Sequence, residues 1–249
     1  MSQQSNSLTD LTWREADDLF HKKPLALLPI GAVEAHGPHL PLYTDVFLSK
    51  ELCERLAKSL APKPTIILPP VNYAVANYAA EFAGTISLSP NTAKELLSDI
   101  FRSLGRHGVE FVAMINSHLE PAHISVLEEV AQDFLERPHV IFTNHCRKPL
   151  AQRLSPEFQS GDCHAGSYET SLMLASRWKD LVKKDKMKTL PPIKLGLVKQ
   201  MRQGVATFGA MGANDAYFGE PAVSTAEHGE ILWQTLIEIW TEAIKSEMG

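Results

Sequence analysis

Four short stretches of the chain are almost uniformly apolar. They are residues 25–30, 65–68, 109–115 and 140–143. Runs of this length, without polar positions in alternation, are typical of strands that are covered on both faces. We therefore predict four buried strands.

Between these runs, apolar residues recur at helical spacing. Leu48, Leu52 and Leu56 lie four residues apart, and Ser89 followed by Pro90 is a typical helix start. The predicted helices are 8–22, 46–60, 89–107, 122–136, 167–181 and 225–245.

Strands that alternate with helices predict a mostly parallel sheet with helices on both sides. The fold class is thus α/β, as a three-layer α/β/α arrangement. We expect a single domain over residues 1–249, with residues 1–7 as a flexible polar tail. Residues 145–161 are expected to be irregular and could form a lid, and residues 183–194 to form a surface linker.

Three clusters of histidine and acidic residues lie near predicted element ends. The first follows strand 25–30, the second follows strand 109–115, and the third lies around the start of helix 167–181. Their members are Glu34, His36 and Asp45; His118 and Glu120; and Asp162, His164 and Glu169. In open parallel sheets, sites form beyond the carboxyl ends of the strands.

Imidazole nitrogen and carboxylate oxygen suit divalent ions such as zinc and manganese. If the clusters converge, they supply more ligands than one ion needs. Two ions about 3.5–4 Å apart can share one carboxylate. Asp45 is the candidate bridge, although it could also be only the cap of helix 46–60.

The composition of the chain limits the class of molecule that it is expected to bind. The chain is 44% hydrophobic and 21% charged, with a formal net charge of -5 and a pI near 6.1. This balance does not favour nucleic acid or an anionic membrane, so we expect a small-molecule substrate. No signal segment or membrane span is evident, and three distant cysteines fit a reducing compartment, so the expected location is the cytoplasm.

Four motifs resemble the creatininase (creatinine amidohydrolase) family. They are residues 31–45, 82–85, 116–120 and 164–171, in the family's order and approximate spacing over about residues 25–235. The resemblance implies a metal-dependent hydrolase of non-peptide C–N bonds. It also implies two divalent ions per subunit, zinc or manganese with iron as a further possibility, and a homohexamer.

The resemblance also implies ligand sets. Glu34, Asp45 and His118 would hold one ion. His36, Asp45 and an acid, either Glu120 or Glu169, would hold the other.

Further roles follow from the same resemblance. Glu120 is alternatively a catalytic residue that handles protons. His164 stands where creatininase has a substrate-contacting histidine, and it is a candidate proton carrier or oxyanion donor. Asp162 is a candidate to orient it.

The substrate pocket departs from creatininase. Leu119 replaces an aromatic residue, and Ala76 stands where a serine is expected. We assign Leu119, Ala76, Asp162 and His164 to substrate binding. The metal chemistry is expected to persist, whereas creatinine is not the expected substrate.

The leading hypothesis is therefore hydrolysis of a small cyclic amide or formamide by metal-activated water. A nucleotide formamide would need phosphate contacts, for which Arg147, Lys148 and Arg202 are available. The alternative is a creatininase-like subunit with a non-catalytic or peptide-maturation role in cofactor biosynthesis. A binding protein without metal is a third possibility.

The other histidines are expected to be structural or peripheral. His39 lies near two prolines, and we expect it to be structural. His123, His139 and His145 are expected at the surface or at strand ends. Cys163 is expected to be a packed small residue rather than a ligand.

Overall fold

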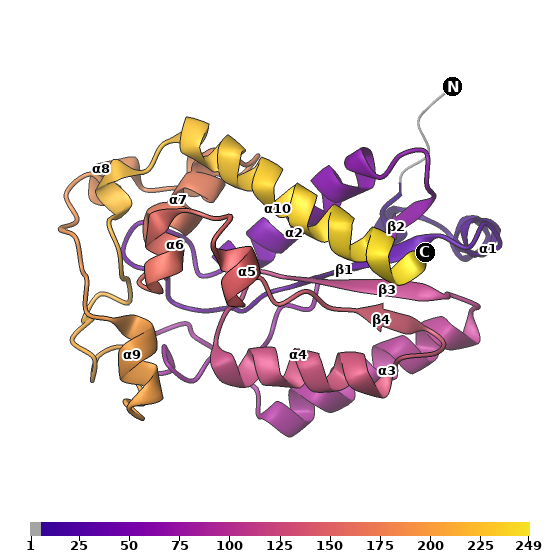
Figure 1. Cartoon of the computed structure of the whole chain (residues 1–249), viewed down its shortest axis with the longest axis horizontal. Helices are drawn as coiled ribbons and strands as arrows, with labels where there is room; N and C mark the ends of the chain where they lie inside the picture. The colour runs from indigo at the N-terminus through magenta and orange to yellow at the C-terminus, as the bar shows by residue number, and fades with distance from the viewer. Residues whose placement is uncertain (1–5) are drawn as a thin grey trace.

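The computed structural model describes residues 6–249 and is built on one parallel sheet. Its strands are β1 (Leu25–Ile30), β2 (Thr65–Ile67), β3 (Phe111–Asn116) and β4 (His139–Ile141). They lie in the order β2-β1-β3-β4, with β1 in the interior (Figure 1). The register pairs Ile30 of β1 with Asn116 of β3, so these two strands end side by side.

Helices cover both faces of the sheet, which confirms the predicted three-layer α/β/α class. On one face lie α2 (Thr44–Ser59), α7 (Ser167–Leu174) and α10 (Ala226–Met248). On the other lie α3 (Pro90–Arg106) and α4 (Pro121–Asp133), with α1 (Trp13–Phe20) packed at its edge (Figure 1). Successive β1 residues alternate between the two apolar clusters, as a pleated strand requires.

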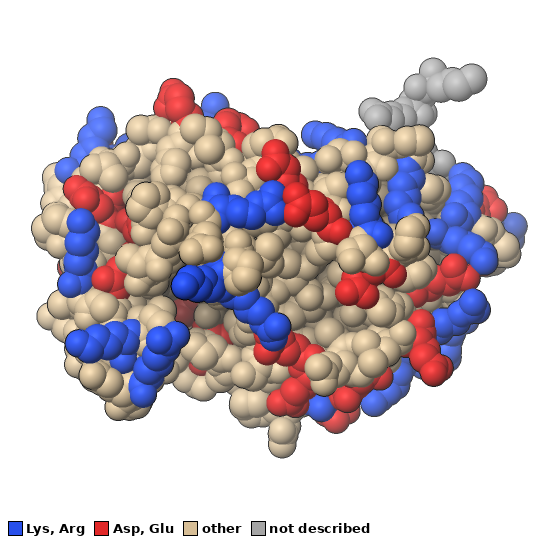
Figure 2. Space-filling model, in the orientation of Figure 1, with Lys and Arg blue, Asp and Glu red and all other residues tan. Residues whose placement is uncertain are grey.

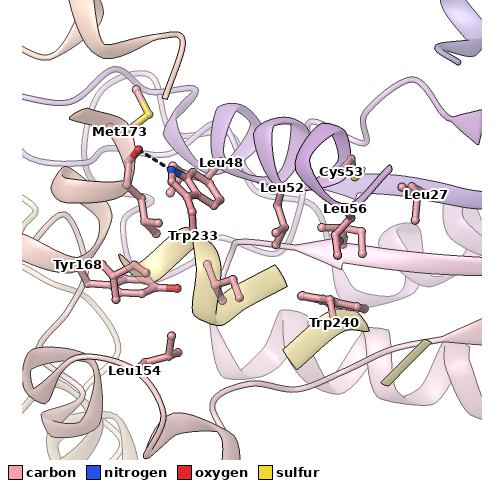
Figure 3. Packing of buried hydrophobic residues seen from close by; sticks show 14 of the residues in the cluster. Leu27, Leu48, Leu52, Cys53, Leu56, Leu154, Tyr168, Met173, Trp233 and Trp240 are labelled. Atoms are coloured by element: carbon pink, nitrogen blue, oxygen red, sulfur yellow. Dashed lines mark hydrogen bonds between the residues drawn. The ribbon is translucent and has the colours of Figure 1, made fainter. Parts of the chain in front are cut away.

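The layer of α2, α7 and α10 has an aromatic centre. Leu48, Leu52 and Leu56 of α2 share one buried cluster with Trp233 and Trp240 of α10. Figure 3 shows these side chains between the two helices. Trp233 Nε1 donates to the carbonyl oxygen of Leu172 in α7 at 3.2 Å, which satisfies the indole N–H inside the core.

Two predicted helices are shorter than the sequence pattern indicates. The segment 8–22 divides into a 3₁₀ helix, Leu8–Asp10, and α1, because Thr12 and Glu15 form a capping box that starts a new helix. The segment 167–181 divides at Ser176, whose hydroxyl donates to Met173 and accepts from the N–H of Trp178. A serine that bonds nearby backbone in this way competes with the helix.

Segments expected to be irregular contain short helices. Residues 145–161 include α5 (Lys148–Ala151) and α6 (Pro156–Ser160), and the predicted linker 183–194 includes α8 (Lys184–Met187). Prolines in the first turns of α5 and α6 fit the start of a helix, where no N–H partner is needed. The glycine-rich region contains α9 (Leu197–Arg202) and ends at one 3₁₀ helix, Pro221–Val223.

The predicted tail falls largely outside the described residues, which begin at Asn6. The Asn6 carbonyl accepts from the N–H of Ile67 at 2.7 Å, and Ser7 forms an isolated parallel bridge to the same residue. Among the described helices, none combines the length and apolar character needed to cross a bilayer.

Candidate metal centre

The predicted clusters meet at the carboxyl ends of β1 and β3. The loop after β1 carries Glu34 and His36, and the turn after β3 carries His118. Asp45 comes from the first turn of α2, and Glu169 from the first turn of α7. All five residues are at most 3% exposed.

Gly31 allows α2 to approach the end of β1. A Cβ atom at this position would lie 2.5 Å from the backbone nitrogen of Val46 and 2.8 Å from Cβ of Asp45. Only glycine fits such a contact without displacing Asp45. The helix cap is Tyr43, not Asp45. The Asp45 carboxylate is therefore available to the site.

Asp45 faces two histidines with its two oxygens. Oδ1 lies 3.0 Å from Nε2 of His36, and Oδ2 lies 3.0 Å from Nδ1 of His118. Glu34 Oε2 is 3.1 Å from the same nitrogen of His118, and Glu169 Oε2 is 3.6 Å from that of His36. Two groups that could hold a metal ion result: Glu34, Asp45 and His118; and His36, Asp45 and Glu169.

Each histidine is oriented by a backbone carbonyl. His36 Nδ1 lies 3.0 Å from the carbonyl oxygen of Glu34, and His118 Nε2 lies 2.8 Å from that of Val75. A carbonyl only accepts, so these nitrogens carry protons and the opposite nitrogens point at the carboxylates. Metal-binding histidines typically have this arrangement. The residues present thus fit a pair of divalent ions.

The pKa shifts of these residues support this fit. Burial lowers the pKa of His36, but Asp45 and Glu169 more than offset it and raise the pKa to about 10. Burial likewise opposes protonation of His118, yet Glu34 and Asp45 raise its pKa well above the usual value. Burial alone would raise the pKa of Asp45, but the two histidines hold it well below its usual range. Bound metal ions would supply positive charge at the place where these carboxylates favour it.

The two acids that the sequence left open occupy different places. Glu169 lies in the second group, and its Oε2 accepts from the N–H of Ala165 at 2.6 Å. Burial raises its pKa to about 8. Glu120 lies outside the candidate groups found among residues 6–249. It lines the adjoining pocket, accepts from the N–H of Tyr78 at 3.2 Å, and has its pKa raised by burial to about 7.

His164 lies over His36, with ring centroids 4.4 Å apart. Its Nε2 is 2.9 Å from the carbonyl oxygen of Ala35, so Nε2 carries the proton and Nδ1 of the neutral ring can only accept. Burial lowers its pKa to about 4. This arrangement suits a proton acceptor or a metal ligand, and His164 forms a third candidate group with Glu34 and His36. A neutral His164 held this way has no free N–H for an oxyanion.

Two residues assigned to substrate contact lie elsewhere. Ala76 packs with Ala32 and Ala74, away from the pocket wall. Asp162 does not orient His164; its carboxylate accepts from the N–H groups of Gly196 and Leu197. Leu119 does line the pocket.

The pocket beside the centre has a volume of about 1140 Å³. Figure 2 shows a hollow on this face, with acidic atoms recessed inside it and Lys and Arg side chains near α5 and α9. Its wall includes Tyr78 and Phe208, which the sequence did not single out. The glycine-rich stretch that contains Phe208 was the only signal for the latter.

The positions of two other histidines differ from the prediction. His123 and His145 are buried rather than peripheral. His123 Nε2 lies 3.2 Å from Oδ1 of Asn116, the same side chain that holds the backbone of His118. His39 bonds Thr170 at 2.8 Å inside the core. Cys163 is buried and lies outside the candidate metal groups of the described chain.

Comparison with known proteins places these observations in a family. The model of the family "Creatininase: Creatinine amidohydrolase" matches residues 9–244. Creatinine amidohydrolase of Pseudomonas putida is 28% identical, with the match covering 96% of this chain and 95% of the relative. A mycofactocin precursor peptide peptidase of Mycolicibacterium smegmatis is 27% identical, over 89% of this chain and 85% of the relative.

A solved structure agrees in fold. A creatininase mutant of the Zn–Zn type superposes with a TM-score of 0.73 at 25% identity, covering 98% of this chain and 99% of that one.

Proposed function

Because the chain belongs to the creatininase family, we propose that it is an amidohydrolase with a dinuclear metal centre. Its substrate is a small cyclic amide or a formamide, and the bond it hydrolyses is a non-peptide C–N bond. The zinc pair named for a solved creatininase and the donor types here favour Zn²⁺ or Mn²⁺.

One observation carries this proposal: the two oxygens of Asp45 face different donor groups. Glu34 and His118 would complete one ion's ligands, and His36 and Glu169 the other's. When bound, such ions polarise a substrate carbonyl and lower the pKa of water. The orienting carbonyls of Glu34 and Val75 keep both imidazoles aimed at the ligand positions.

Glu120 is the candidate proton carrier. It lines the pocket, close in sequence to the ligand His118 but outside the ligand groups. The N–H of Tyr78 holds one carboxylate oxygen in place. From this position Glu120 can take a proton from the attacking water and deliver it to the leaving nitrogen. His164, with Nδ1 as an acceptor, is the second candidate.

A substrate panel with metal analysis tests the proposal. The purified protein is loaded with Zn²⁺ or Mn²⁺, its metal content is measured, and cyclic ureas, lactams, imides and formamides are assayed for hydrolysis. We expect about two equivalents of metal per chain and turnover of at least one of these classes. Metal content well below one equivalent per chain would indicate a binding protein without metal, and the proposal would fail.

A second candidate is peptide maturation. The relatives named mycofactocin precursor peptide peptidases favour it, as does a pocket larger than a small cyclic amide needs. Short peptides belong in the same panel, with products identified by mass spectrometry. Release of an amino acid or dipeptide without turnover of any non-peptide amide would select this function instead.

The family resemblance also supports a homohexamer in the cytoplasm as part of the proposal. Light scattering after size-exclusion chromatography would test the assembly. A particle with the mass of one chain, 27.6 kDa, would contradict it.

A further inference from the structure

Charge is segregated within the pocket that adjoins the metal centre. The acids Glu34, Asp45, Glu120 and Glu169 line its depth and are buried. The three cations that line it, Lys148, Lys199 and Arg202, are all exposed. We call these three residues the cationic rim.

The cationic rim is not neutralised within the protein. Across residues 6–249, no ion pair within 4.0 Å involves Lys148, Lys199 or Arg202. Arg147 differs, because it pairs with Glu128 at 2.8 Å and lines a separate depression. The cations on the pocket are therefore free to meet a ligand, whereas their neighbour is not.

Two members of the rim are held by the segment that carries His164. Lys199 and Arg202 lie three residues apart on α9, which puts them on neighbouring positions of one helix face. Asp162 accepts from the N–H of Gly196 at 3.0 Å and of Leu197 at 2.5 Å, fixing the start of α9. Gly161 lies against Val198 so closely that a Cβ atom would be 2.5 Å from its Cγ2. The part of the rim on α9 is thus a built feature of the pocket.

From this arrangement we propose that the substrate is an amide that also carries an anionic oxygen group, a carboxylate or a phosphate. The amide lies at the metal centre, and the anion is bound at the cationic rim. This inference rests on the proposed function for its reactive end. Hydrolysis adds OH to the carbonyl carbon and H to the nitrogen, and it leaves the anionic group unchanged.

Charge chemistry supports the assignment. Oxyanions bind ammonium and guanidinium groups through charge-assisted hydrogen bonds. A neutral cyclic amide would make no use of three cations, and the cavity of about 1140 Å³ exceeds what such a small molecule fills. In a protein with a net charge of -5, a cationic pocket entrance also favours the approach of an anion over the rest of the surface.

The activity test compares matched formamides with the metal-loaded enzyme. N-formyl-β-alanine carries a carboxylate, N-formylethanolamine phosphate carries a phosphate, and N-formylethanolamine is neutral. We expect kcat/KM to be at least about tenfold higher for one anionic compound than for the neutral one. The ratio between the two anionic compounds identifies which oxyanion is bound.

Single substitutions show which side chains cause the preference for the anionic substrate. Lys148→Ala, Lys199→Ala and Arg202→Ala should each lower the anionic-to-neutral ratio about threefold to tenfold, and 0.5 M NaCl should lower it in the unchanged enzyme. Lys186→Ala is the matched control, because Lys186 is exposed on α8 and does not line the pocket. A ratio that is equal in all variants would overturn the inference.

A binding test separates this inference from the proposed function. Calorimetry with succinate, inorganic phosphate and neutral succinamide is run on the metal-loaded enzyme and on the triple rim variant, with metal content measured for both. Binding of one anion that is at least about tenfold weaker in the triple variant at equal metal content supports the rim, even if no amide is hydrolysed. Equal affinities in both proteins would overturn the rim even if amides are hydrolysed.

Discussion

Asp45 contacts both histidine-containing groups, so one side chain controls two candidate ion sites. We predict that Asp45→Ala lowers bound metal from about two equivalents to well below one and abolishes hydrolysis. Elemental analysis of the purified variant is the measurement. Asp162→Ala is the matched control for metal content, because that carboxylate bonds α9 and not the centre. Full metal content in Asp45→Ala would remove its bridging role.

A change at Glu120 should leave the metal bound and slow the reaction. Glu120→Gln keeps the hydrogen bond to Tyr78 possible but cannot carry a proton. We predict near-normal metal content and a kcat lowered about 10²–10⁴-fold, the range for loss of a general acid or base. Metal analysis and steady-state kinetics on the same sample check both parts. Loss of one metal equivalent would instead make Glu120 a ligand.

His145, a buried histidine outside the candidate metal centre, should make the stability of the fold depend on pH. Burial lowers its pKa to about 4, against about 6.5 in an unfolded chain. The stability gained by keeping the ring neutral is fully present above pH 6.5, and it is lost progressively as the pH falls from 6.5 to 4.

The prediction concerns the free energy of unfolding at pH 7 and at pH 4, measured with urea. In His145→Gln, the loss between these two values should shrink by about 3 kcal/mol relative to the unchanged protein. An identical loss in both proteins would mean that His145 is protonated without cost when folded.

At the scale of single residues, the types of metal ligand could be predicted from the sequence. The directions in which their side chains point could not. Histidines and acids near element ends indicated the centre. The proposal of Glu169 rather than Glu120 as a ligand depends on the turn at Ala165, which has a φ of 51° and directs its N–H to Glu169. Asp162 was misassigned because its partners, Gly196 and Leu197, are distant in sequence.

The contact between α7 and α10 depends on Gly229. A Cβ atom there would overlap the carbonyl oxygen of Ser171 and lie 2.6 Å from Cβ of Ala175. We predict that Gly229→Ala lowers the free energy of unfolding by about 1–3 kcal/mol, the usual cost of overpacking. Thermal or urea unfolding measures this change.

Gln234→Ala is the control on the same helix, because Gln234 is exposed. Its effect should stay within about 0.5 kcal/mol. A Gly229→Ala variant as stable as this control would show that α10 can shift freely away from α7.

At the scale of elements, apolar pattern predicted the strands well because each strand is buried on both faces. It did not predict where helices stop. The break after α7 depends on the hydroxyl of Ser176, and the start of α1 on the pair of Thr12 and Glu15. Such local side-chain bonds interrupt a helix without changing its apolar periodicity.

At the scale of the whole molecule, the candidate centre joins two strand-end loops to the first turns of α2 and α7. We predict that chelation lowers the melting temperature. Bound metal stabilises the folded state by about 2.7 kcal/mol when free ion is at 100 times its Kd. Calorimetry with Zn²⁺ and with EDTA measures the difference. Asp45→Ala should show none, and an equal response in that variant would mean that the ions act elsewhere.

The packing of α2 against α10 has a consequence for biosynthesis. Leu48, Leu52 and Leu56 leave the ribosome long before Trp233 and Trp240, the residues that cover them. For that interval the growing chain presents an uncovered apolar helix face, the kind of surface that chaperones recognise and that promotes aggregation. Co-expressed chaperones and slow translation at low temperature should therefore raise the yield of folded protein.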